Sequence, residues 1–163
     1  MSPPESMQPH AARKTLAFGA ALLLPLVWSV ATEAWPGLAN VALRFAGPRY
    51  LGPYLALAYG SVLLAMLSGV LIGLALRGTP RVGAPAMISP GTVALAALPG
   101  LWAFVFAGGG PVGAALWLGA GYVLVLAIDW RFWRLGLAPV WWWPMRLIQT
   151  AVILPCLLVT AFG

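Results

Sequence analysis

The sequence predicts an all-α membrane protein: a bundle of about five transmembrane helices with an interfacial elbow before the last helix. Three observations predict this class. Of the 163 residues, 62% are hydrophobic and only 7% are charged, whereas soluble domains carry about 25% charged residues. Five apolar runs approach the roughly 20 residues that a spanning helix needs. Arginine and tryptophan gather at the ends of these runs, as they do at membrane interfaces.

The chain divides into a flexible polar tail, residues 1–12, and a single transmembrane helical domain, residues 13–163. Arg13 and Lys14 precede the first apolar run, which we expect to span as residues 16–34. This arrangement also resembles a signal peptide, with Ser29-Val30-Ala31 as a cleavage site of small residues. Trp28 crowds that site, so we expect a retained first helix.

The second span is expected at residues 53–76, after a charged and proline-rich stretch (residues 35–52) whose apolar residues could lie flat on the membrane as a short helix. Small residues recur at every fourth position of this span: Ser61, Ala65, Gly69 and Gly73. Because lipid provides no hydrophobic drive between helices, small residues act by letting two backbones approach. We expect this small-residue stripe to pack within the bundle; the alternative is packing against another subunit.

The remaining spans are expected at residues 87–106, 112–128 and 145–162. The run Gly108-Gly109-Gly110-Pro111 predicts a tight turn between the third and fourth spans, because glycine takes left-handed dihedral angles and proline starts helices. Pro25, Pro99 and Pro155 interrupt the first, third and fifth spans. Broken helices can line transport sites, but neighbouring helices commonly satisfy the carbonyls that proline frees.

Between the fourth and fifth spans lies an interfacial elbow rich in charge and aromatic rings. Its candidate functional residues are Asp129, Trp130, Arg131, Trp133, Arg134, Trp141, Trp142, Trp143 and Arg146. Asp129 is interpreted as part of an interfacial ion pair that fixes the elbow, a pair of small energetic value where water reaches it. The alternative is a proton or ligand site, because ionisable groups inside membranes usually serve a function.

The distribution of Arg and Lys predicts the orientation. Seven of them (Arg13, Lys14, Arg77, Arg81, Arg131, Arg134 and Arg146) fall on the N-terminal side, and two (Arg44 and Arg49) fall on the other. The N-terminus is therefore expected to be cytoplasmic.

Few residues of this chain could carry chemistry. The single histidine, His10, lies in the tail, so no intramembrane histidine is available to ligate haem, chlorophyll or a metal. Glu33 and Asp129 are expected on opposite sides of the membrane, where they cannot act as a pair. The lone Cys156 is interpreted as a small buried hydrophobe. We expect no catalytic, cofactor-binding or metal-binding residues, and no enzymatic activity.

Several short stretches resemble an uncharacterised membrane family, domain of unknown function 3429, which contains transmembrane protein 69 of mitochondria. In the helical half they are Ala58-Tyr59-Gly60-Ser61, Leu67-Ser68-Gly69-Val70-Leu71-Ile72-Gly73, Leu98-Pro99-Gly100-Leu101-Trp102 and Gly119-Ala120-Gly121-Tyr122. Around the elbow they are Asp129-Trp130-Arg131, Gly136-Leu137-Ala138-Pro139, Trp142 and Met145-Arg146-Leu147. The resemblance covers roughly residues 15–160. This chain has Leu71-Ile72 where the family pattern has a His-Trp pair, so any role of that histidine is absent here.

The resemblance implies an inner membrane of bacteria or mitochondria and no established activity. The tryptophan-rich sensory proteins, a second small family of five helices, fit less well because their Pro-Pro-x-Trp loop is missing. We expect a non-catalytic accessory, assembly or stabilising subunit of a larger inner-membrane complex, plausibly respiratory or photosynthetic. The alternative is a protein that binds or transports a small apolar ligand or a lipid. The expected partners are membrane lipids and other integral membrane subunits, without nucleic acid, and the expected location is the bacterial cytoplasmic membrane.

Overall fold

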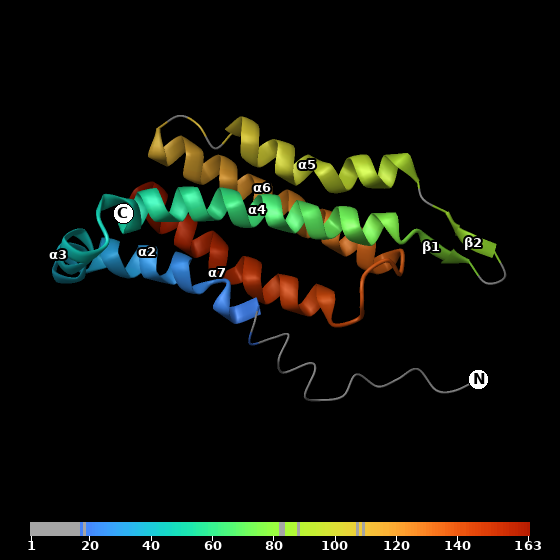
Figure 1. Cartoon of the computed structure of the whole chain (residues 1–163), viewed down its shortest axis with the longest axis horizontal. Helices are drawn as coiled ribbons and strands as arrows, with labels where there is room; N and C mark the ends of the chain where they lie inside the picture. The colour runs from blue at the N-terminus through green and yellow to red at the C-terminus, as the bar shows by residue number, and fades with distance from the viewer. Residues whose placement is uncertain (1–16, 18, 82–83, 88, 107, 109) are drawn as a thin grey trace.

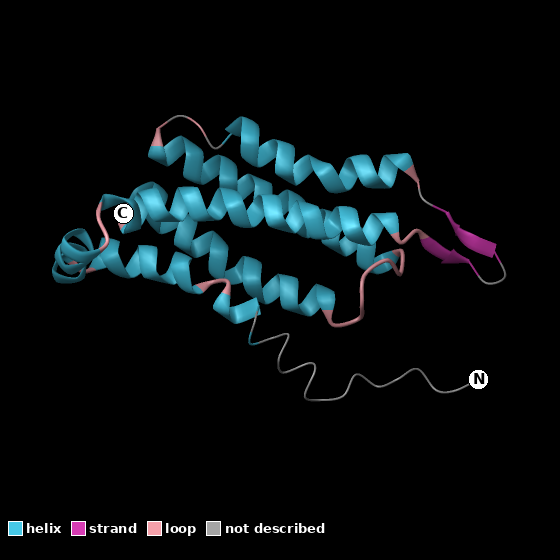
Figure 2. Ribbon diagram, viewed as in Figure 1, coloured by secondary structure: helices cyan, strands magenta, loops and turns pink. Residues whose placement is uncertain are grey.

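The computed structural model describes residues 17, 19–81, 84–87, 89–106, 108 and 110–163. The predicted tail, Arg13 and Lys14 lie outside this part of the chain. The described residues form an elongated bundle of helices that run up and down beside one another, with a small hairpin at one end (Figures 1 and 2). The predicted all-α membrane bundle is confirmed. Among the described residues, the two short strands of the hairpin are the only β-structure.

The first helix is broken near its start by Pro25. Helical residues 19–21 lead through a turn into α2, Leu24–Ala34. Proline has no N–H and clashes with the carbonyl four residues before it. The N–H groups of Leu23 and Leu26 accordingly bond only three residues back, to Ala20 and Leu23. The carbonyls of Gly19 and Leu22 are thereby left for side chains of other helices, and the Tyr59 hydroxyl donates to Leu22 O at 2.8 Å.

A sharp bend separates this helix from α3, Pro36–Phe45: the chain turns by 118° between the two helices. Pro36 disfavours a helical conformation in the residue before it, and Trp35 is extended, with φ −126° and ψ 98°. A short 3₁₀ turn, η1 (Pro48–Tyr50), then leads into α4. The expected short helix between the first and second spans is therefore present, and it lies across the first helix.

The long helix α4, Gly52–Leu76, lies at the centre of the bundle and contacts each of the other long helices. Its inward face carries residues spaced three or four apart, which share one side of a helix. The fully buried members of that face are Ala56, Leu64 and Leu71. Helix α5 packs on one side of α4, and α2 and α7 pack on the other (Figure 1).

An antiparallel hairpin connects α4 to α5 and alters one predicted boundary. Strands β1 (Thr79–Arg81) and β2 (Ala84–Met87) pair with Thr79 opposite Met87. Helix α5 therefore starts at Pro90, three residues after the predicted start of the span at residue 87. It ends at Phe106, as predicted. The Ser68 hydroxyl of α4 donates to Ala96 O at 2.7 Å, close to Pro99.

The elbow is shorter than expected because α6, Pro111–Arg134, continues six residues beyond the predicted end of the fourth span. Gly136, with φ +71°, ends the helix: its N–H donates to Trp133 O, and the Leu137 N–H donates to Phe132 O. This is the Schellman arrangement, which glycine favours because it takes a positive φ without strain. Residues 135–141 make the connection to α7, Trp142–Phe162.

Three described helices are long and apolar enough to cross a membrane: α4, α6 and α7. The bent pair Gly19–Ala34 and Pro36–Phe45 makes a fourth if it counts as one span. Helix α5 has 17 residues, fewer than the roughly 20 of a full span. By length, the described part of the chain thus supports three or four spans, and the expected five require α5 to cross as a short helix.

The small-residue stripe does not pack inside this bundle. Ser61 is half-buried and donates to Leu57 O within its own helix, whereas Ala65, Gly69 and Gly73 are exposed. A Cβ added at Gly69 or Gly73 would meet no atom within 4 Å. The expectation of packing within the bundle is wrong for these three residues, because the stripe lies one position, about 100°, around the helix from the inward face.

Close approach of helices occurs at other glycines. A Cβ at Gly121 of α6 would lie 2.7 Å from Leu64 Cδ2 and 2.8 Å from Trp102 Cδ1. A Cβ at Gly100 of α5 would lie 3.1 Å from Ser68 Oγ. These two positions, not the stripe, let α4, α5 and α6 approach one another.

Candidate functional site

The candidate site is a buried polar network where α6 and α7 meet near the elbow. Asp129 lies five residues before the end of α6, and Arg146 lies one turn into α7. The chain reversal at residues 135–141 places these two positions side by side. Both side chains are 1% exposed, so the pair lies inside the protein and not at a wet interface. The predicted ion pair at the elbow is therefore present, but the small value expected of a wet pair does not apply, because Asp129 belongs to the inward face of a continuing helix.

Both oxygens of the Asp129 carboxylate accept hydrogen bonds from α7. The Arg146 Nε–H donates to Oδ2 at 2.8 Å, and the Trp142 indole N–H donates to Oδ1 at 2.7 Å. A paired and hydrogen-bonded charge is the form in which proteins tolerate burial. This arrangement links the last turns of α6 to the first turn and a half of α7.

The network continues into the first helix through Gln149. The Arg146 Nη1–H donates to Gln149 Oε1 at 2.6 Å, and the Gln149 amide donates to Gly19 O at 3.2 Å. That carbonyl is available because the break before Pro25 removes its usual helical partner. A chain of four side chains and one backbone carbonyl therefore connects α6, α7 and the start of the first helix.

Two buried polar atoms in this region have no hydrogen-bond partner among the described residues: Arg146 Nη2 and Thr150 Oγ1. Thr150 lies one turn beyond Arg146 and is 2% exposed. Other buried hydroxyls of the bundle bond to backbone carbonyls, either of their own helix, as Thr160 does to Cys156 O, or of a neighbouring helix, as Ser68 does to Ala96 O. A buried donor without a partner costs about 1–3 kcal/mol, so this is the least satisfied part of the described interior.

A second buried hydroxyl joins the middle of the bundle. Tyr122 of α6 is fully buried, and its hydroxyl donates to Gly60 O of α4 at 2.7 Å. Gln149, Thr150 and Tyr122 were not among the sequence candidates. Gln149 and Thr150 are polar residues within an otherwise apolar run, and this signal could have marked them as facing inward.

The other sequence candidates around the elbow divide into two groups. Trp142, Asp129 and Arg146 face inward, whereas Trp130, Trp133, Arg131 and Arg134 are exposed on the last two turns of α6. Trp141 and Trp143 are half-buried, and the rings of Trp141 and Trp142 meet edge to face at 5.9 Å. The residues predicted as one cluster are thus divided between an internal polar network and a separate outer surface.

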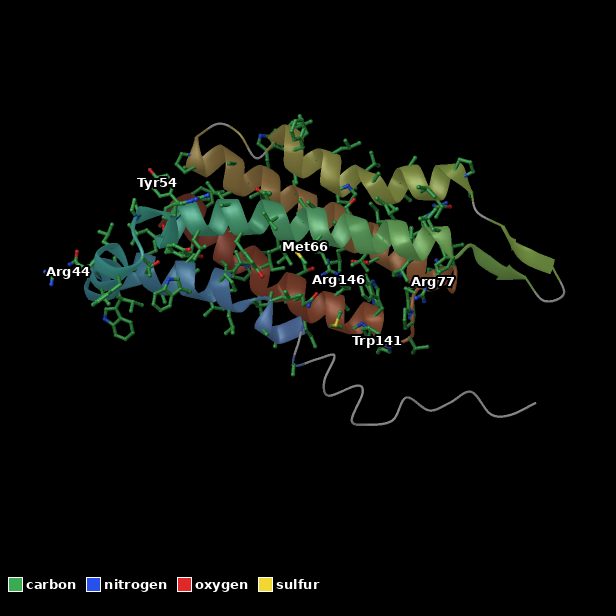
Figure 3. All side chains as sticks on the ribbon, viewed as in Figure 1. Arg44, Tyr54, Met66, Arg77, Trp141 and Arg146 are labelled. Atoms are coloured by element: carbon green, nitrogen blue, oxygen red, sulfur yellow. The ribbon has the colours of Figure 1, made fainter. Side chains whose placement is uncertain are left out.

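The geometry separates the carboxylates. Glu33 is in the last turn of α2, at the end of the bundle that carries α3, and Asp129 is at the end that carries the hairpin. Figure 3 shows Arg44 and Tyr54 at the first end and Arg77 and Trp141 at the second. Within the described residues, no three His, Cys, Asp or Glu side chains come together as a metal site would need. The network can orient and hold helices, and among the described residues no second carboxylate joins Asp129 for acid–base chemistry.

One family profile matches residues 11–162; it is described as a protein of unknown function, DUF3429. A comparison with curated proteins and a comparison with solved structures find no match.

Proposed function

Because this chain belongs to the DUF3429 family, whose description assigns no activity, we propose a function from its own surfaces and interior: a non-catalytic accessory, assembly or stabilising subunit of a larger membrane protein complex. An inner membrane of bacteria, with the N-terminus in the cytoplasm, is part of this proposal, as is a respiratory or photosynthetic complex. A relation to transmembrane protein 69 of mitochondria is proposed on the family resemblance alone.

The observation that carries the proposal is the outward direction of the small-residue stripe. Ala65, Gly69 and Gly73 leave a smooth strip on the outer face of α4, where a Cβ at either glycine would have open space. Lipid tails gain nothing specific from such a strip, but another helix can approach closely and gain van der Waals contact. We propose a transmembrane helix of another integral membrane protein as its partner.

The interior supports a structural role. Asp129, Trp142, Arg146 and Gln149 bond to one another and to the first helix, so their hydrogen bonds hold the fold together. Hydrogen bonds are electrostatically stronger inside a protein than in water, so these bonds between helices resist movement of one helix past another. A rigid bundle that presents a smooth helix face is suited to stabilising a neighbour.

The test is Gly69→Leu, assayed by native electrophoresis of membranes solubilised in mild detergent. The leucine side chain points into open space in the isolated bundle, and leucine is a better helix former than glycine, so the variant bundle is expected to be no less stable than the wild type. Association with the larger complex is expected to weaken, because the added side chain separates the two backbones. The matched control is Gly113→Leu, an exposed glycine of α6 that also has open space around it.

If both variants associate as the wild type does, the stripe is not the interface. A free monomer that carries a stoichiometric small apolar molecule would instead favour the alternative, a lipid-binding or ligand-binding protein.

A further inference from the structure

We propose that the groove between the last turns of α6 and the start of α7 binds one anionic phospholipid, with its headgroup at Arg134. The groove is shallow and open to the outside, has a volume of about 370 Å³ and is lined by Val123, Leu126, Ala127, Trp130 and Trp143. The proposal concerns the outer surface of these helices and does not depend on the accessory role.

The apolar part of the groove fits an acyl chain. Val123, Ala127, Trp130 and Arg134 are spaced three or four residues apart, so they share one face of α6. Val123 and Ala127 are exposed, and together with Trp130 and Trp143 they line a shallow, open channel along α6. The channel runs in the direction of the helix, which is also the direction of lipid tails in a bilayer.

The charged end of the groove fits a phosphate. Arg134 is the last residue of α6 and is exposed. Its guanidinium carbon lies 4.9 Å from the centre of the Trp130 ring. Stacking holds the guanidinium against a ring that lines the groove, and its N–H groups can donate to phosphate oxygens in the planar geometry that arginine favours. Tryptophan supplies an indole N–H at the depth of headgroups and ester carbonyls.

No described carboxylate opposes an anion here. Asp129, the described acid at this end, faces the interior and is neutralised by Arg146. Arg131 and Arg77 are also exposed at this end of the bundle, but Arg134 is the arginine that lies against a ring lining the groove. The charge at the groove mouth therefore selects a lipid with a net negative headgroup over a zwitterionic one.

The test is a lipid titration of the purified full chain in detergent, followed by native mass spectrometry with dioleoyl phosphatidylglycerol or dioleoyl phosphatidylcholine. The wild type is expected to bind the first phosphatidylglycerol at least about fivefold more tightly, the effect of roughly one arginine near a lipid headgroup. Arg134→Gln is expected to abolish this preference. Arg77→Gln, which removes an exposed arginine of the same end from another helix, is expected to retain it.

A second variant tests the groove itself. Ala127→Leu fills the channel without entering the core, because Ala127 is exposed, and it is expected to weaken the binding of both lipids severalfold. Equal affinity of the wild type for the two lipids, or a preference that survives in Arg134→Gln, would overturn the proposal. Unchanged binding in Ala127→Leu would also overturn it, because the acyl chain would then lie elsewhere.

Discussion

The Nε of Arg146 lies 2.8 Å from Oδ2 of Asp129, and this ion pair lies in the interior of the bundle between α6 and α7. Its two partners come from the two sides of the elbow, 17 residues apart in the chain. Each is held by a further hydrogen bond, from Trp142 to Asp129 and from Arg146 to Gln149. The pair therefore fixes the angle and register of two helices at one end of the bundle.

Asp129→Asn tests the value of the pair. The change leaves the Arg146 guanidinium as an uncompensated buried charge, and breaking a buried pair in this way costs about 3–5 kcal/mol. We expect a large fall in the thermal denaturation midpoint in detergent, followed by tryptophan fluorescence. The control removes both charges: Asp129→Leu with Arg146→Met should recover most of the loss. A single variant as stable as the wild type would show that water reaches the pair.

Thr150→Val tests the unsatisfied hydroxyl. Valine has nearly the shape of threonine, and the Thr150 Oγ1 has no described partner. Removing it should leave the free energy of unfolding unchanged or raise it by up to about 1–3 kcal/mol. The comparison is Thr32→Val, because Thr32 Oγ1 accepts the Gly52 N–H at 3.0 Å and its loss should destabilise the protein. Destabilisation by Thr150→Val would mean that its hydroxyl has a partner in solution.

Gly121→Ala and Gly69→Ala should have opposite effects on the stability of the isolated bundle. The new methyl group at position 121 meets Leu64 and Trp102 below 3.0 Å, and such overpacking costs about 1–3 kcal/mol. At position 69 it meets nothing, and alanine is the better helix former by about 1 kcal/mol. Denaturation of both variants side by side measures the difference. Equal losses at the two sites would contradict the assignment of the inward face of α4.

Orientation can be measured with reporter fusions. The described arginines lie unequally between the two ends of the bundle: Arg77, Arg81, Arg131 and Arg134 are at the end of the hairpin, and Arg44 and Arg49 are at the end of α3. The positive-inside bias predicts a cytoplasmic hairpin and a C-terminus on the far side. A reporter inserted in the hairpin should be active as a cytoplasmic fusion, and one after Gly163 should be active as an exported fusion. The reverse pattern would contradict the predicted topology.

The fold class could be predicted from the sequence because a chain with so few charges can be solvated only by lipid. The inward face of α4 could not. In a membrane both the lipid-facing and the buried sides of a helix are apolar, so a small-residue stripe does not show which side packs inward. From the sequence alone, either face of α4 could be the buried one: the face of Ala65, Gly69 and Gly73 or the face of Leu64 and Leu71. The positions of the neighbouring helices decide between the two faces.

The depth of Asp129 differs from the prediction for a different reason. The first charge after an apolar run predicts the end of the helix, but α6 continues to Arg134 because Asp129 finds its partners on α7. Those partners lie across the turn that Gly136 makes possible, and sequence spacing alone does not reveal which face of α7 Arg146 occupies. The sequence therefore predicts that Arg146 lies near Asp129, but it does not predict that the two side chains are buried together.

The central claim is that this bundle serves as a subunit of a larger membrane complex, and the most direct measurement is its native mass. Membranes containing the tagged full chain would be solubilised in mild detergent, resolved by native electrophoresis and probed for the tag. The account predicts migration with a species several times larger than the 17.1 kDa chain in its detergent micelle, and a shift of Gly69→Leu, but not Gly113→Leu, towards the monomer. Migration of the wild-type protein as a free monomer would contradict it.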